Sequence, residues 1–108
     1  MSQYTLFGRG KSGSYFVECL LQEANVEYNF ETFSYEETKK PNFLKVNPLA
    51  RTPVLVTPEG QTIIETVAIF IHLVEKFPVV APAVNSFERN LMWQHLSVLS
   101  TSLFASYY

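Results

Sequence analysis

Two pairs of polar residues stand where helices are predicted to begin. Ser12 and Ser14 precede an apolar periodic segment, where a hydroxyl group can either donate to a ligand or serve as a turn or helix cap. Glu65 and Thr66 open a second such segment. The free N–H groups and the positive dipole end of a helix suit a carboxylate, so this pair predicts an anion site, with an ordinary N-cap as the alternative.

A proline directly precedes a run that predicts a buried strand. Pro53 stands before Val54–Val56, which is apolar and mostly β-branched. Proline offers no N–H to a β-ladder, and it keeps Thr52 out of the helical region of backbone space. Two cations belong to the same part of the chain, Arg51 beside Thr52 and Lys39 in the preceding polar loop.

Composition limits the classes of function. The chain has 108 residues, of which 47% are hydrophobic and 17% charged, with a net charge of −2. These values are typical of a core-forming globular chain and argue against nucleic acid or a membrane as the main partner. Cys19 is the one cysteine, which excludes an internal disulfide, a CxxC pair and a cysteine-rich zinc site, and His72 and His95 lack companion ligands. We therefore expect no metal.

Two further features concern localisation. The first residues, MSQYTLFG, do not form a basic segment followed by a long apolar one, so we expect no secretory signal and a cytoplasmic protein. Residues 91–108 contain no Lys, Arg, Asp or Glu, but polar residues interrupt the run. A membrane helix needs about 20 predominantly apolar residues, so we expect an amphipathic packing helix here instead.

Hydrophobic periodicity predicts the order of elements. Asn25 fits the left-handed end of the first helix, and Asn85 with Glu88 forms a predicted capping box for the last. The helix after residue 65 is apolar nearly all round, so it needs a second partner besides the sheet. In chain order we expect a strand at 4–7, a helix from 14, a strand within 26–33, a polar loop or short helix at 34–43, a hairpin of strands at 54–57 and 61–65, a helix at 66–77, a proline-rich linker at 78–84 and a helix from about 86.

This order, with a proline opening the third strand, is the thioredoxin-like arrangement. Several motifs at mutually consistent spacing resemble the amino-terminal domain of cytosolic glutathione S-transferases: NP at 47–48, TPVL at 52–55, ET at 65–66 and EKFP at 75–78. The resemblance covers about residues 4–78, and NSFERNLMWQHL resembles the first helix of that family's all-helical second domain. We therefore expect an α/β thioredoxin-like β-α-β-α-β-β-α domain that binds glutathione at 1–80. A linker and one helix of an incomplete helical domain are expected at 81–108.

The resemblance implies which of the polar residues above binds each part of glutathione. It implies that Pro53 is cis and that the N–H and C=O of Thr52 bind the cysteinyl part of glutathione, strand against strand. It implies that Glu65 pairs with the ligand's ammonium group, while Thr66 binds the neighbouring carboxylate with its hydroxyl and N–H. It implies that a cation, Arg51 or Lys39, binds the carboxylate of the glycine unit, and we favour Arg51.

Glutathione chemistry also requires an activated thiol. A free thiol has a pKa near 8.5, and the thiolate is the nucleophile. The resemblance to serine-type transferases assigns activation to Ser12, because Ser14 fits better as the helix N-cap. Tyr4 is a less favoured alternative that comes early in its strand, and Cys19 is expected to be a packing residue. The segment GKSGS lacks the Pro or Cys that these classes often carry.

The resemblance implies a glutathione S-transferase that activates the glutathione thiol for attack on a small electrophile, with glutathione as co-substrate and a homodimer as the assembly. The alternative is a non-catalytic transferase-like module for protein assembly or regulation. In this family the second domain builds most of the electrophile pocket, so we expect little turnover from 108 residues alone. The electrophile is not predicted.

Overall fold

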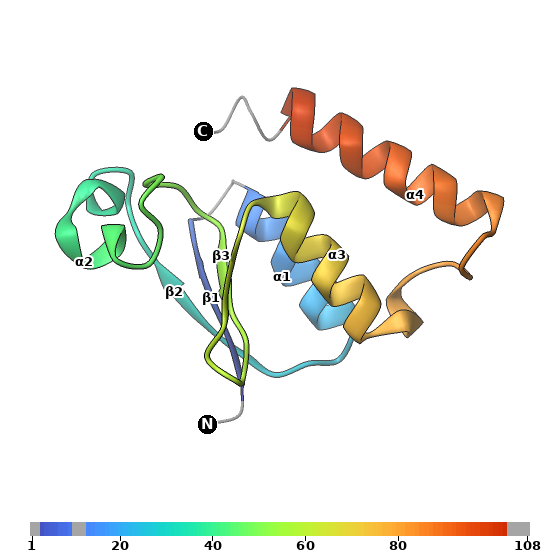
Figure 1. The fold of residues 1–108 in the computed structure, drawn as a ribbon, viewed down its shortest axis with the longest axis horizontal. Helices are drawn as coiled ribbons and strands as arrows, with labels where there is room; N and C mark the ends of the chain where they lie inside the picture. Colours follow the sequence, from blue (N-terminus) through green and yellow to red (C-terminus); the bar gives the residue numbers. More distant parts are fainter. Residues whose placement is uncertain (1–2, 10–12, 104–108) are drawn as a thin grey trace.

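A four-stranded mixed sheet forms the centre of the molecule (Figure 1). The computed structural model describes residues 3–9 and 13–103. The strands are β1 (Tyr4–Gly8), β2 (Tyr28–Thr32), β3 (Val54–Val56) and β4 (Thr62–Ile64), in the order β2-β1-β3-β4. β1 pairs parallel with β2 and antiparallel with β3, and β3 pairs antiparallel with β4. The thioredoxin-like fold expected from the sequence is confirmed.

Two helices cover one face of this sheet and build the core. Helices α1 (Gly13–Glu23) and α3 (Thr66–Lys76) lie side by side there (Figure 1). The predicted stripe of α1 points inward, because burial of apolar side chains is what holds an amphipathic helix on a sheet. The core contains the fully buried side chains of Leu6, Val17, Leu21, Leu55, Ile69 and Leu73.

The segment between β2 and β3 forms two short helical turns on the other side of the sheet (Figure 1). These are η1 (Glu37–Lys39) and α2 (Pro41–Leu44), so the loop predicted at 34–43 is partly helical. Phe43 of α2 is fully buried, and its ring lies 4.9 Å from the ring of Phe33. This contact holds α2, which directly follows the turn that carries Lys39, against the end of β2.

Loop geometry confirms two predicted turns. Asn25 ends α1 with a φ of 60°, and Gly60 in the β3–β4 hairpin has a φ of 88°. Only glycine adopts the second conformation without cost, which is why the hairpin carries it there.

Strand β2 is shorter than predicted and lies at an edge of the sheet, so Phe30 stays 37% exposed despite its place in an alternating pattern.

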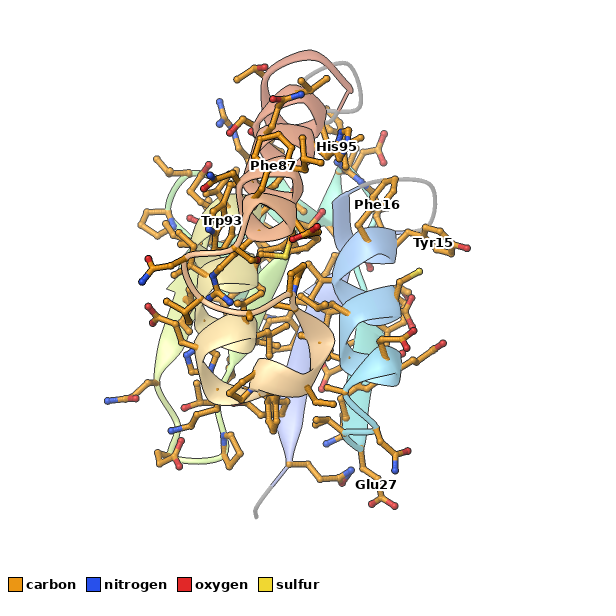
Figure 2. The ribbon with its side chains drawn as sticks, turned by 90° about the vertical axis from the view of Figure 1, so that its right-hand side faces the viewer. Tyr15, Phe16, Glu27, Phe87, Trp93 and His95 are labelled. Atoms are coloured by element: carbon orange, nitrogen blue, oxygen red, sulfur yellow. The ribbon has the colours of Figure 1, made fainter. Side chains whose placement is uncertain are left out.

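The last described elements lie above α1 and α3. A short turn, η2 (Pro78–Val80), leads to α4 (Phe87–Val98), which ends in a π-helical turn, η3 (Leu99–Leu103). Figures 1 and 2 show α4 lying above the other two helices. In the part of the chain that the structure describes, no helix has the length and apolar character to cross a membrane.

The predicted cap of α4 is wrong by one residue. Ser86, rather than Asn85, is the N-cap, and its Oγ accepts a hydrogen bond of 3.1 Å from the Arg89 N–H. An N-cap residue needs extended backbone angles. Ser86 has them, with φ −83° and ψ 156°, whereas Asn85 has a φ of 69°.

Candidate ligand site beside the Thr52–Pro53 bond

A tight loop, residues 47–53, leads into β3. The buried side chain of Asn47 spans this loop, with Oδ1 accepting from the Leu49 N–H at 2.9 Å and Nδ2 donating to the Arg51 carbonyl at 2.9 Å. Ala50 has a φ of 58°, which the loop imposes on a residue other than glycine. Asn47 therefore holds the backbone immediately before Thr52.

The peptide bond between Thr52 and Pro53 is cis. Thr52 is only 1% exposed, and its Oγ1 has no hydrogen-bond partner among the described residues. Thr52 and Pro53 line a small hollow together with Asn47, Arg51 and Glu65. The structure thus brings together the start of β3 and the start of α3, which are separated by the hairpin.

Glu65 stands at the N-terminus of α3 with an unusual backbone. Its φ is 78° and its ψ 126°, and it is exposed. It occupies the N-cap position, yet its side chain makes no capping hydrogen bond to the described part of the helix. Thr66, the first residue of α3, is buried. The carboxylate of Glu65 is therefore available at the hollow rather than used to cap its own helix.

A second, polar hollow adjoins the first. Its volume is about 220 Å³, and its walls come from Arg9, Tyr35, Lys39, Leu49, Ala50 and Arg51. Lys39 Nζ lies 4.3 Å and Arg9 Cζ 5.8 Å from the centre of the Tyr35 ring. Arg51 lines both hollows. We call the two hollows together the trough: Glu65 lines the first, Arg9 and Lys39 line the second, and Arg51 is shared by both.

The turn from β1 to α1 borders this trough. Ser14 Oγ accepts from the Arg9 N–H at 2.9 Å and donates to the Arg9 carbonyl at 2.7 Å. Ser14 lies inside α1 and is buried, so its predicted role as N-cap is wrong. A Cβ on Gly8 would overlap the Ser14 side chain, so this close approach requires glycine. Ser12 lies outside the described residues.

Comparison with known proteins identifies the family. Residues 2–75 match the family model described as glutathione S-transferase, N-terminal domain. The chain belongs to the glutathione S-transferase family. Among curated relatives, Protein URE2 of Candida glabrata is 40% identical over 82 residues, which are 71% of this chain and 23% of that protein. The uncharacterised GST-like protein YncG of Escherichia coli is 30% identical over 103 residues, 88% of this chain and 50% of that protein.

Solved structures of the family show the same fold. A glutathione transferase homologue from Sulfitobacter, with bound glutathione, superposes with a TM-score of 0.89 at 22% identity, covering 99% of this chain and 53% of that one. Ure2p in complex with glutathione gives a TM-score of 0.79 at 26% identity, covering 93% and 49%. The chain spans half or less of the length of the curated relatives named above.

Tyr4 and Cys19, the less favoured thiol-activating residue and the single cysteine, lie away from the trough. Tyr4 begins β1, at the opposite end from Gly8, and its OH lies 2.9 Å from His72 Nε2. Burial, with a smaller contribution from Glu59, raises the pKa of Tyr4, which disfavours the phenolate. Cys19 is exposed, so the packing role predicted for it is wrong; it lies off the buried stripe of α1.

The trough also contains residues that the sequence did not single out. Arg9, Tyr35 and Asn47 belong to three separate segments, and no periodic pattern or spacing connects them. Of these, Asn47 was noted only as part of the NP motif. An arginine between two glycines, directly after a strand, was the one available signal for Arg9. Within the described residues, no group of side chains has the composition of a metal site.

Proposed function

We propose that this protein binds glutathione and activates its thiol for attack on small electrophiles. The observation that carries the proposal is the charge distribution of the trough, with Glu65 in the first hollow, Arg9 and Lys39 in the second, and Arg51 lining both. Glutathione has an ammonium group at its γ-glutamyl end and a lone carboxylate at its glycine end. The trough is complementary to this distribution.

Each part of glutathione has a proposed partner. Glu65 pairs with the ammonium group, and the N-terminus of α3 at Thr66 receives the neighbouring carboxylate. The backbone of Thr52, beside Pro53, pairs with the cysteinyl unit as an added strand. Arg51, with Lys39 as the second candidate, binds the glycine carboxylate. The matching family and the glutathione-bound structures of relatives support these assignments.

Ser12 remains the proposed thiol-activating residue. Its competitor Ser14 is buried and exchanges two hydrogen bonds with the Arg9 backbone, which favours Ser12 for the thiol. A hydroxyl donor near the start of α1 stabilises the thiolate and lowers the thiol pKa. Replacing Ser12 by alanine should raise the pKa of bound glutathione's thiol, measured by its ultraviolet absorbance, whereas an unchanged titration would remove Ser12 from this role.

Isothermal titration with glutathione tests the binding proposal. Glu65→Gln keeps the side-chain size and removes the charge, so we expect binding to weaken by about 1–3 kcal/mol, the range for losing a charge-assisted hydrogen bond. Glu75→Gln, an exposed change near the other end of the same helix, serves as the control and should bind like the parent chain. Equal affinity in the parent and Glu65→Gln chains would contradict the proposal.

A non-catalytic module is the second candidate. The similarity to URE2 supports it, because the Saccharomyces cerevisiae relative, 38% identical over 79 residues, is described as a transcriptional regulator. Measuring turnover of glutathione with an activated aryl halide separates the two. Binding without turnover in the full-length protein would favour the module.

We further propose a cytoplasmic homodimer, for which the exposed apolar pair Val67 and Ile71 on α3 offers a surface.

A further inference from the structure

We infer that the side-chain hydroxyl of Thr52 is a second hydrogen-bond donor to the thiol of the bound peptide, and that it selects ligands with a cysteine at this position. This inference rests on the proposed function, which assigns only the backbone of Thr52 to the cysteinyl unit. Thr52 lies two residues before β3 and lines the first hollow together with Pro53 and Glu65.

Thr52 Oγ1 is an exception among the buried polar atoms. The residue is only 1% exposed, so bulk water does not reach the hydroxyl. Within the described residues, it is the one buried side-chain oxygen or nitrogen without a hydrogen-bond partner. Buried polar atoms are nearly always hydrogen-bonded, because an unpaired one has lost its bonds to water without replacement. The hydroxyl therefore requires a partner that the described chain does not supply.

Two other buried threonines show how the fold uses this side chain. Thr38 Oγ1 donates to the Tyr35 carbonyl at 2.6 Å. Thr57 Oγ1 accepts from the Gln61 N–H at 3.1 Å. Thr52 Oγ1 makes no such bond, and valine has a similar shape and a similar preference for extended backbone. Valine would therefore serve the fold at position 52 at least as well, since an unpaired buried hydroxyl is costly.

Strand pairing places the ligand's thiol beside this hydroxyl. In the proposed complex the N–H and C=O of Thr52 both bind the cysteinyl unit, which is the pattern of a hydrogen-bonded antiparallel pair. The side chains of two directly opposed residues lie on the same face, with Cβ atoms about 5 Å apart. The ligand's Sγ and Thr52 Oγ1 are each one bond further on, so rotation about the Cα–Cβ bonds can bring them within hydrogen-bonding distance.

The chemistry of the hydroxyl fits a thiolate. A threonine hydroxyl has one proton to donate, and a bond to an ionised acceptor is roughly twice as strong as a bond between neutral groups. Such a bond favours the ionised ligand and lowers the pKa of its thiol, in addition to the effect proposed for Ser12. A ligand with a methyl group in place of the thiol gains nothing from it.

Two tripeptides of the same shape test the contact: γ-Glu-Cys-Gly and γ-Glu-Abu-Gly, in which 2-aminobutyrate (Abu) replaces the thiol by a methyl group. Isothermal titration of the full chain at about pH 8 gives the ratio of the two affinities. In Thr52→Val this preference for the thiol peptide should be about tenfold smaller than in the parent chain, the order of one charge-assisted hydrogen bond. The pKa of the bound thiol, followed by ultraviolet absorbance, should lie about one unit higher.

Further variants separate the contact from a structural role. Thr52→Ser keeps the hydroxyl and should keep the parent's preference, whereas Thr52→Ala removes it in a smaller side chain and should lose the preference as Thr52→Val does. Thr57→Val is the matched control. It removes a buried hydroxyl that has a partner beyond the other end of β3, so it should lower the urea midpoint and leave the affinity ratio unchanged. Thr52→Val should unfold at the same or a higher urea concentration than the parent, because no bond within the described chain is lost.

The outcomes also separate this inference from the proposed function. If both peptides bind and their affinity ratio is the same in the parent, Thr52→Val and Thr52→Ala, the thiol contact is wrong and glutathione binding stands. An unchanged ratio with a lower urea midpoint in Thr52→Val assigns the hydroxyl to an internal water, which also overturns the inference. If the parent chain binds neither peptide, both proposals fail. Loss of the thiol peptide's advantage in the two variants without the hydroxyl, but not in Thr52→Ser, supports the contact.

Discussion

Glu65 combines a strained backbone with a carboxylate that its own helix does not use. A φ of 78° is costly for any residue with a Cβ, by about 1–3 kcal/mol. Folding alone would be better served by glycine at this position. An acid at this strained position fits a role in ligand binding, for which the direction of the side chain matters more than local stability.

Two substitutions of Glu65 should separate stability from binding. Glu65→Ala and Glu65→Gly both remove the carboxylate, so both should weaken glutathione binding by about 1–3 kcal/mol. Only the glycine variant relieves the positive φ, so its free energy of unfolding should be about 1 kcal/mol higher than that of the alanine variant, which raises its urea midpoint. Urea titration followed by circular dichroism measures this difference. Identical midpoints would contradict the strain.

His72 provides a pH dependence of stability. Burial and the nearby Lys76 lower the pKa of His72 below its usual 6.5, against smaller opposing effects of Glu59 and Glu75. In the window between the lowered pKa and 6.5, the unfolded chain binds the proton more readily than the folded chain. The free energy of unfolding should therefore decrease as the pH falls from about 7.5 through this window.

Substituting His72 tests the origin of this slope. His72→Gln keeps a hydrogen-bonding group near Tyr4 and cannot titrate, so its stability should change less between pH 7.5 and 5.5 than that of the parent. Thermal unfolding at several pH values gives the comparison. If the stability of His72→Gln changes with pH as much as that of the parent, a group other than His72 causes the pH dependence.

Among the elements, the loop before β3 does most to position the site. In this loop the buried side chain of Asn47 makes the hydrogen bonds that regular secondary structure would otherwise provide, to the Leu49 N–H and the Arg51 carbonyl. Asn47→Ala leaves two backbone groups without these bonds, at about 1–3 kcal/mol for each group that stays unsatisfied. We expect lower stability in urea and weaker glutathione binding together, because Arg51 and Thr52 follow directly. Asn42→Ala, an exposed change on α2, is the control.

The elements that the sequence predicted best are those whose signals are local. The β3–β4 hairpin follows from Gly60 between two apolar runs, and the inward face of α1 from its 3.6-residue period. The cap of α4 was misassigned because Asn85 and Ser86 are both good cap residues. Only the backbone path from the preceding turn decides between them.

For the molecule as a whole, the site is predictable only in part. The motifs at 52–53 and 65–66 are short and recognisable, so the sequence located the middle of the trough and its acidic end. The cationic end depends on β1 and the segment after β2 lying together, which parallel pairing brings about over a long sequence separation. No local pattern encodes that approach, so Arg9 and Tyr35 were missed.

An apolar hollow lies between α4 and the helices below it. Its volume is about 300 Å³, and its walls come from α1, α3, η2, α4 and η3, including Phe70, Val74, Trp93 and Leu96. The Cζ atom of Arg89 lies 5.7 Å from the centre of the Trp93 ring. Wet apolar surface costs roughly 25 cal/mol per Å², so covering this hollow would be favourable.

We therefore predict that the chain of 108 residues self-associates through α4 at tens of micromolar. Sedimentation velocity should show a mass that rises with concentration, and the emission of Trp93 should shift to shorter wavelength as its surroundings lose water. Leu99→Glu places a charge at the hollow and should weaken association, because a buried unpaired charge is costly, whereas Gln94→Glu on the exposed side of α4 should not. The same chain should turn over an aryl halide only slowly. A monomer at every concentration, together with rapid turnover, would show that neither a partner chain nor further protein is needed to complete this fold.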